Sequence, residues 1–269
     1  MLESSAPIGI FDSGIGGMTV ASAVTRLLPR ENTIYFGDTA HLPYGDKSTA
    51  AIQAYSIKIC NMLLQQQCKL ILIACNSASA AAYELVREYV GSKAKVMNVI
   101  DPVVDYIKDR YDGKTVGLIG TKQTVLSNVY KKKVDALNKN ITLKSLATPL
   151  LAPMIEEGFF DNSISESIID KYLSDPALEG IESLILGCTH YPLIKNQIRQ
   201  YYEDHVEILD TSEIVAQSLK AWMEQHYLLN AKGNGERRFY VSDYTQSFEA
   251  STNLFFGKQI QLSHYPLWE

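Results

Sequence analysis

The stretch KLILIACNSASAAAYEL (residues 69–85) joins an apolar run to a helical pattern through a cysteine, Cys75. A second stretch, SLILGCTHYPLI (residues 183–194), repeats this arrangement around Cys188. Both apolar runs are continuous rather than alternating, which is typical of strands in a parallel sheet covered by helices on both faces. Each cysteine is therefore expected at the carboxyl end of a buried strand, where open α/β sheets bind their ligands.

The same alternation of strand and helix runs along the chain. Strands are expected at residues 7–12, 32–38, 68–75 and 94–101, with helices at 16–28, 49–66 and 77–90. The series then restarts, with strands at 114–121, 141–148, 181–188 and 206–210 and helices at 123–138, 163–175 and 191–202. A helix at 212–229, a polar linker at 230–238, a strand at 238–243 and a helix at 244–257 follow.

This order predicts an α/β protein with two similar blocks, each an open, doubly wound and mostly parallel sheet. The second block begins near Asp101, and the segment after Asp210 is too short to fold alone. We therefore expect a first domain of residues 1–100 plus 211–269 and a second domain of residues 101–210.

The composition disfavours several classes of protein. The chain has 269 residues, 46% of them hydrophobic, so it can bury a substantial core. A net charge of −5 argues against a nucleic-acid partner, and the basic run at 131–133 is typical of a solvated helix face. No apolar run reaches the roughly 18 residues of a membrane span, and no secretory signal is present. The four cysteines are expected to be reduced thiols in a cytoplasmic protein.

The two strand-end cysteines are candidates for acid–base chemistry. Both precede predicted helices, whose N-termini can lower the thiol pKa from its ordinary value of about 8.5. Cys60, within a helix, and Cys68, before a strand, are instead expected to be small buried hydrophobic residues. Three alternatives stay open: an inert Cys75, a disulfide between the blocks, and a metal site of Cys75, Cys188 and His190. A cytoplasmic setting disfavours the disulfide, and the lack of a close-spaced ligand pair disfavours the metal.

Two thiols that face each other across a crevice suit one reaction in particular. To invert a carbon centre through a planar carbanion, one group removes the proton and another returns a proton to the opposite face. A single base would have to move round the carbon or return the proton where it came from. The pair therefore predicts a racemase or epimerase that uses general acid–base catalysis and no cofactor.

The loop after the first strand, FDSGIGGMT (residues 11–19), exposes N–H groups at the start of a helix. Its glycine spacing does not fit a dinucleotide fingerprint. We interpret the loop instead as a cradle for a carboxylate, with Ser13 as a donor. Asp12 could orient a thiol, accept a proton from an amino group, or only cap the helix.

The loop after the second strand, FGDTAHLPYGDKS (residues 36–48), contains Asp38 and a turn whose N–H groups could bind a second carboxylate. His190, two residues beyond Cys188, could polarise that thiol or be purely structural. Further candidates to hold the two ends of an amino acid are Pro43, Tyr44, Gly45, Asn76, Ser77, Thr121, Thr124 and Thr189.

Five motifs together resemble the ordered motif set of bacterial glutamate racemases, in the aspartate/glutamate racemase superfamily. They are FDSGIGGMTV, YFGDTAHLPYG, ACNSASA, PMIEEG and LGCTHYPLI, and the resemblance runs from about Pro7 into the C-terminal segment. It implies two pseudo-symmetric α/β domains with the active site in the cleft between them, and neither a metal nor another cofactor. Racemisation of L- and D-glutamate, as a supply of D-glutamate for peptidoglycan, is the activity implied.

The resemblance also implies roles for individual residues. Cys75 is the base expected to act on D-glutamate and Cys188 the base for L-glutamate, with Asp12 assisting Cys75 and His190 assisting Cys188. Glu156 of PMIEEG is expected nearby, chosen over Glu157 by register alone. The substrate-binding set implied is Ser13, Asp38, Pro43, Tyr44, Gly45, Asn76, Ser77, Thr121, Thr124 and Thr189.

One residue differs from the commoner pattern of the family, and two alternative functions stay open. Ser77 stands where the family most often has threonine, which keeps the hydroxyl group. The chain begins almost at the first strand, so activation by a cell-wall precursor through an N-terminal extension is not expected. A homodimer is the assembly implied. The alternatives are a racemase of aspartate or another amino acid, and a non-catalytic amino-acid-binding protein.

Overall fold

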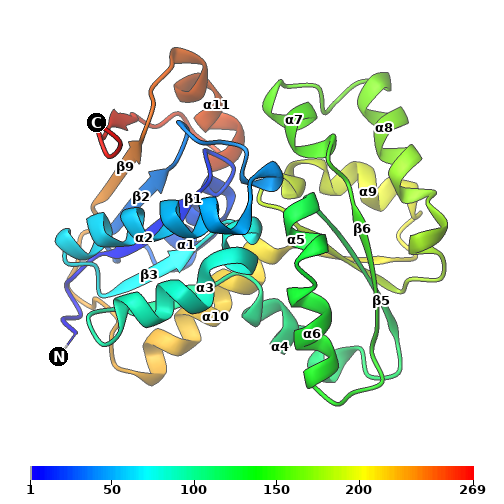
Figure 1. Cartoon of the computed structure of the whole chain (residues 1–269), viewed down its shortest axis with the longest axis horizontal. Coiled ribbons are helices and arrows are strands. Elements are labelled where there is room, and N and C mark those ends of the chain that lie inside the picture. Colours follow the sequence, from blue (N-terminus) through cyan, green and yellow to red (C-terminus); the bar gives the residue numbers. More distant parts are fainter. Residues whose placement is uncertain (1) are drawn as a thin grey trace.

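The computed structural model describes residues 2–269, which form two parallel β-sheets side by side, each with helices on both faces (Figure 1). The first sheet has six strands in the order β10-β9-β2-β1-β3-β4. Their bounds are β1 Ile8–Asp12, β2 Thr33–Gly37, β3 Leu70–Ile73, β4 Lys95–Asn98, β9 Arg237–Val241 and β10 Ser263–His264. The helices of this half are α1 Met18–Leu27, α2 Thr49–Gln65, α3 Asn76–Val90, α10 Thr211–Gln225, α11 Gln246–Phe256 and the 3-10 turn η1 Tyr44–Asp46.

The second sheet has four strands in the order β6-β5-β7-β8. Their bounds are β5 Thr115–Gly120, β6 Thr142–Ala147, β7 Ser183–Gly187 and β8 Glu207–Leu209. The helices of this half are α4 Asp101–Arg110, α5 Lys122–Leu126, α6 Val129–Ala136, α7 Leu151–Glu156, α8 Ser163–Leu173 and α9 Lys195–Tyr201, with 3-10 turns η2 Pro176–Leu178 and η3 Tyr191–Ile194. All strand pairs in both sheets are parallel. The α/β fold class predicted from the sequence is therefore confirmed.

The continuous apolar character of the strands has a simple structural cause. Alternate residues of β3 face opposite sides of the sheet, and both sides are buried. Leu70 and Leu72 pack in the core under α1 and α10, whereas Ile71 and Ile73 pack in the core under α2 and α3. Strand β7 does the same in the second half, where Ile185 packs on the other side from its two leucine neighbours.

The two sheets share a topology that places the two thiols at equivalent points. The order β2-β1-β3-β4 in the first sheet matches β6-β5-β7-β8 in the second. Strand β3, which is followed by Cys75, is therefore the counterpart of β7, which is followed by Cys188. Ligands of such sheets bind beyond the carboxyl ends, where the chain turns away on either side of the first strand.

Two predicted helices differ from the structure. The helix expected at 123–138 is broken into α5 and α6, because Asn128 takes a left-handed conformation (φ 56°) that asparagine tolerates better than most residues. The helix expected at 191–202 begins as the 3-10 turn η3 and becomes α-helical only at Lys195. Helices α4 and α7 were not singled out by the sequence patterns.

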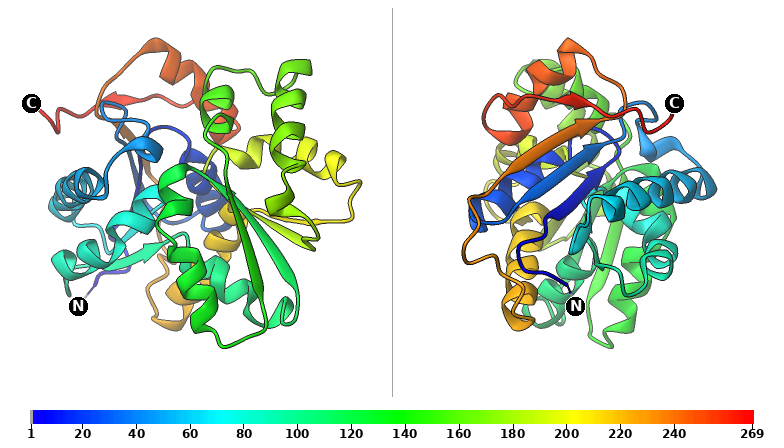
Figure 2. Two further views of the ribbon diagram at one scale, coloured as in Figure 1. Left: turned by 45° about the vertical axis from the view of Figure 1, so that its right-hand side comes forward. Right: turned by 90° about the vertical axis from the view of Figure 1, so that its left-hand side faces the viewer.

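The chain passes between the sheets twice, through α4 and through α10, and these two helices pack against each other. After α10 the chain returns to the first sheet, where β9 and β10 extend its edge (Figure 2). The domain boundaries at 100/101 and 210/211 stay a proposal, and this sheet membership supports them. Across residues 2–269, no helix combines the length and apolar character needed to cross a membrane.

Candidate active site

A small buried cavity lies where the carboxyl ends of the two sheets face each other. Its volume is about 30 Å³, room for about two water molecules, so the surrounding groups must separate to admit a ligand the size of an amino acid. Both strand-end thiols line it. The complete lining is Ser13, Pro43, Tyr44, Gly45, Cys75, Asn76, Ser77, Thr121, Ala152, Glu156, Gly187, Cys188, Thr189 and His190.

Cys75 is the N-cap of α3, and its sulfur accepts a hydrogen bond from the backbone N–H of Ala78 at 3.4 Å. Its thiol points to Ser13, with 3.7 Å between Sγ and Oγ. Burial, reinforced by the nearby Asp12 carboxylate, raises the pKa of Cys75 to about 12 despite these hydrogen bonds. Cys75 is therefore a neutral thiol at physiological pH.

Cys188 has a different environment, because the helix that follows it is only the short turn η3. Its sulfur lies 3.6 Å from Nδ1 of His190, whose Nε2 lies 2.8 Å from Oε1 of Glu156. Burial alone would lower the pKa of His190, but its hydrogen bonds to Cys188 and Glu156 outweigh burial and raise that pKa well above its usual value. The arrangement therefore favours an imidazolium held between a carboxylate and the sulfur.

Asp12 lies just behind the cavity wall and is fully buried. Its Oδ2 accepts hydrogen bonds from the N–H groups of Gly14 and Gly17 at 3.1 and 2.9 Å, while its Oδ1 has no partner in the described part of the chain. Burial raises the pKa of Asp12, and the neighbouring His190 opposes that shift. Oδ1 is therefore a buried acceptor that no described donor satisfies.

Hydroxyl and amide groups from both halves meet in the cavity wall. Ser77 on α3 and Thr121 at the end of β5 bring their oxygens within 2.8 Å, which joins the two halves directly. Asn76 is oriented by the buried Tyr130, whose hydroxyl donates to its Oδ1 at 2.8 Å. The Asn76 amide nitrogen has no partner among residues 2–269, so it can donate to a ligand.

The glycine loop after β1 permits the closest approach between the halves. A Cβ on Gly16 would overlap the ring of His190 and lie 2.8 Å from Oγ1 of Thr189. Nearby, Thr19 donates a hydrogen bond across the same boundary to the carbonyl oxygen of Thr189 at 2.9 Å. The loop that the sequence suggested as a carboxylate cradle thus also packs against His190 and Thr189, which follow a strand of the other sheet.

Three predicted site residues lie outside the cavity lining. Asp12 sits behind it, as described above. Thr124 is buried and accepts a hydrogen bond from Thr121 at 3.1 Å, so it supports a lining residue. Asp38 lies behind Tyr44, whose hydroxyl donates to its Oδ2 at 2.6 Å. Glu156 reaches the cavity and His190, whereas Glu157 does neither.

Sequence reasoning missed several residues that shape the site. Ala152 and Gly187 line the cavity, and Phe255 packs edge-on against His190 with 5.2 Å between ring centres. Gly187 directly precedes Cys188, so its place at the strand end could have been expected. Ala152 and Phe255 carry no polar signal, and only the packing of α7 and α11 brings them there.

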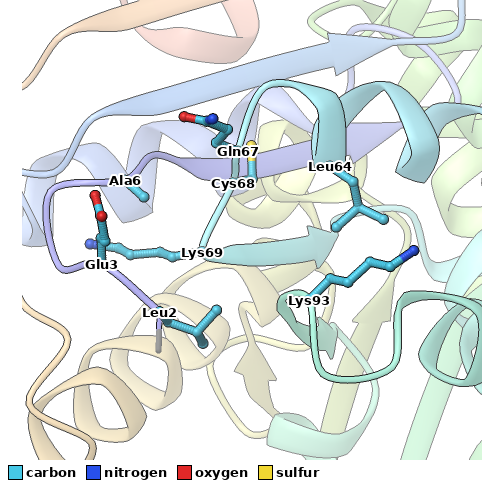
Figure 3. A pocket seen from close by; sticks show the side chains of 8 residues that line it. All are labelled: Leu2, Glu3, Ala6, Leu64, Gln67, Cys68, Lys69 and Lys93. Carbon is cyan, nitrogen blue, oxygen red and sulfur yellow. The ribbon is translucent and has the colours of Figure 1, made fainter.

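A second cavity, of about 390 Å³, opens at the amino end of β3, away from the thiol pair (Figure 3). The N-terminal segment and the turn between α2 and β3 form its walls, including Cys68. Its buried Lys69 is already paired with Glu31, with 2.6 Å between Nζ and Oε2. Burial raises the pKa of Cys68 to about 12, in keeping with a structural thiol. Glu3 and Lys93 also line this cavity, and neither Cys75 nor Cys188 is among its lining residues.

The fold and the site together define a racemase of the α/β class. The family model described as Asp/Glu/Hydantoin racemase matches residues 18–219. The chain therefore belongs to the Asp/Glu/Hydantoin racemase family.

Relatives and solved structures narrow this class. Glutamate racemases from Chlorobaculum parvum and a Sulfurihydrogenibium species are 38% and 37% identical to this chain, and each match covers 96% of it and at least 95% of the relative. The crystal structure of glutamate racemase from Francisella tularensis in complex with D-glutamate matches with a TM-score of 0.92 and 39% identity, over 98% of this chain and 99% of that one. The Thermus thermophilus glutamate racemase, in complex with beta-chloro-D-alanine, matches with a TM-score of 0.88 and 37% identity over 98% of both chains. The chain is an isomerase of the glutamate racemase type.

Proposed function

We propose that this protein interconverts L- and D-glutamate by a two-base mechanism in which Cys75 and Cys188 act on opposite faces of the α-carbon. The observation that supports this most directly is that a thiol from each sheet, at topologically equivalent strand ends, lines the same buried cavity. The glutamate racemases that resemble the chain over nearly its whole length support the choice of substrate.

In the L-to-D direction, the Cys188 thiolate removes the α-proton and the Cys75 thiol donates its own proton to the opposite face. The surroundings of the two sulfurs suit these starting states, because burial and Asp12 raise the pKa of Cys75 while His190 supplies a positive charge beside Cys188. The reaction leaves Cys75 as the thiolate and Cys188 as the thiol, which are the states needed for the reverse direction.

Other residues hold the substrate and stabilise the charge that develops when the α-proton leaves. Donors at the cavity wall, among them Ser13, Asn76 and Thr189, suit the α-carboxylate, which takes up negative charge in the carbanion. The unpartnered oxygen of Asp12 suits the ammonium group. The reaction needs no electron-sink cofactor in this scheme, and the fixed donors take that role.

We further propose that the reaction supplies D-glutamate for peptidoglycan in the cytoplasm and that the enzyme works as a homodimer. These proposals rest on the resemblance to bacterial glutamate racemases. The division into domains 1–100 plus 211–269 and 101–210 is part of the same proposal, and substrate entry would require these two parts to move relative to each other.

The proposal is tested by incubating the protein with L- or D-glutamate in heavy water and following optical rotation and deuterium at the α-carbon. We expect both enantiomers to reach the racemic mixture, with one solvent deuteron incorporated per inversion. L- and D-aspartate serve as the comparison, and a higher kcat/KM for aspartate would overturn the choice of substrate. Binding of glutamate without deuterium uptake would instead indicate a non-catalytic binding protein.

A further inference from the structure

The buried carboxylate of Asp38 accepts hydrogen bonds from its own loop and from two distant parts of the chain. Its Oδ2 accepts from the hydroxyl of Tyr44 at 2.6 Å. Its Oδ1 accepts from Oγ of Ser242, just after β9, and from the indole Nε1 of Trp268, both at 2.8 Å. His41 contributes a ring nitrogen 3.1 Å from both carboxylate oxygens. Asp38 therefore links the cavity-lining loop to the C-terminal end of the chain.

The C-terminal segment packs through Trp268 and Tyr265 against aromatic side chains of the first half. The Trp268 ring packs edge-on against His41 and Tyr55, with 4.4 and 5.4 Å between ring centres, and the ammonium of Lys58 lies 4.7 Å from its centre. Three residues earlier, Tyr265 packs edge-on against Phe36 of β2. The C-terminal tail, residues 265–269, thus lies against the first sheet and α2.

We propose that Trp268 is a positioning residue for the substrate-binding loop 43–45, acting through Asp38 on Tyr44, with Ser242 as a second support. This inference rests on the proposed racemase function and adds to it a residue that does not itself line the cavity.

The geometry of Asp38 explains how a residue outside the cavity can act on the loop. One oxygen of the carboxylate holds Tyr44, and the other is held by Ser242 and Trp268, so the tail donors fix the orientation in which the carboxylate faces Tyr44. Tyr44 itself is buried and lines the cavity together with Pro43 and Gly45. The Trp268 indole is one of the donors that set the orientation of the carboxylate, so its loss weakens the support of Tyr44.

The central test is Trp268→Phe, which removes the indole N–H and keeps an aromatic ring against His41 and Tyr55. We expect KM for L- and D-glutamate to rise about 10-fold, while kcat changes less than about two-fold, because a substrate-binding loop is loosened and the thiols are untouched. The matched control is Trp222→Phe, at the only other tryptophan, which stacks on His226 and should leave both constants unchanged. An unchanged KM in Trp268→Phe, or a fall in kcat alone, would overturn the proposal.

A double-mutant cycle separates positioning through Asp38 from a general loss of stability. Asp38→Ala should raise KM at least as much as Trp268→Phe, and the double variant should be no worse than Asp38→Ala alone. Additive effects would mean that Trp268 acts by another route and would contradict the inference. Thermal unfolding of each variant shows whether the change in KM follows a change in stability.

A further readout does not depend on activity. In Trp222→Phe the only remaining tryptophan is Trp268, so its fluorescence reports on the tail alone. Adding Asp38→Ala should increase quenching by acrylamide, and an unchanged signal would show that the contact does not form in solution. If the wild type racemises glutamate and Trp268→Phe has the same KM and kcat as the wild type, only this inference is overturned. A wild type that does not act on glutamate would overturn the proposed function.

Discussion

Cys75 and Cys188 occupy equivalent places in the two sheets, yet the chain surrounds them with different chemistry. Cys75 caps the 15-residue helix α3 and has the buried carboxylate of Asp12 as its charged neighbour. Cys188 precedes only a 3-10 turn and has the ring of His190 3.6 Å away. One thiol is thus kept protonated by burial and negative charge, and the other has a positive partner.

The difference shows that equal topology does not require equal acid–base states. A two-base racemase needs one base deprotonated and the other protonated before each turnover, and the two must exchange states afterwards. The surroundings differ in the sense that the proposed mechanism needs, because Asp12 lies near Cys75 and His190 lies beside Cys188. Four experiments test this difference between the two thiols.

The largest effect is expected from removing either sulfur. Cys75→Ala and Cys188→Ala should each lower kcat/KM for both enantiomers by about 10³-fold or more, since neither inversion can be completed with one base. The measurement is circular dichroism with L- and with D-glutamate, and Cys60→Ala is the matched control because Cys60 lies away from the cavity. Substantial racemisation by either strand-end variant would rule out the two-thiol scheme.

The next effect comes from the charged partners. His190→Asn and Asp12→Asn should each lower kcat/KM by about 100-fold, equally in both directions, because the two enantiomers have the same free energy in solution. The difference between the two thiols should appear in the deuterium isotope effects instead. The deuterium effect with α-deuterated L-glutamate should grow in His190→Asn, and that with α-deuterated D-glutamate in Asp12→Asn. Identical isotope effects in the two variants would show that the partners are not specific to one thiol.

A smaller effect is expected from the glycine loop that packs against His190. Gly16→Ala places a methyl group against Nδ1 of His190 and Oγ1 of Thr189. It should lower kcat/KM about 10-fold, because it displaces the His190 ring. Gly14→Ala is the control, because its Cβ meets only Leu42 at 3.5 Å, an ordinary contact. Activity assays of the two variants decide the point, and equal activities would mean that the ring can adjust without loss.

The smallest effect concerns stability and its dependence on pH. Glu156 helps to raise the pKa of His190 above its unfolded value of about 6.5, so its stabilising effect is complete below that pH and disappears as pH rises through the folded pKa. Glu156→Gln should therefore be less stable than the wild type by about 1 kcal/mol near pH 6, with a difference that shrinks in alkaline solution. Denaturant unfolding at several pH values measures it. A difference that grows with pH would contradict the imidazolium assignment.

Local sequence patterns predicted an element correctly where the hydrophobic pattern of that one segment was clear. The apolar runs before Cys75 and Cys188 predicted buried parallel strands, and the small polar residues after them predicted helix starts or turns. The split between α5 and α6 escaped prediction because its cause is the backbone conformation of one residue, Asn128. Register alone suggested Glu156 over Glu157, and the contact with His190 supports the choice.

The class of fold, the two strand-end cysteines and most of the polar loops could be predicted from the sequence, because hydrophobic periodicity and strand-end chemistry are properties of short segments. The tertiary structure was needed to reveal that Asp38 lies behind Tyr44 and that Trp268 reaches a carboxylate 230 positions away in the chain. Such contacts depend on how the sheets, helices and C-terminal tail dock against one another. That docking is a sum of many small packing terms spread over the whole core, and no short stretch of residues records it.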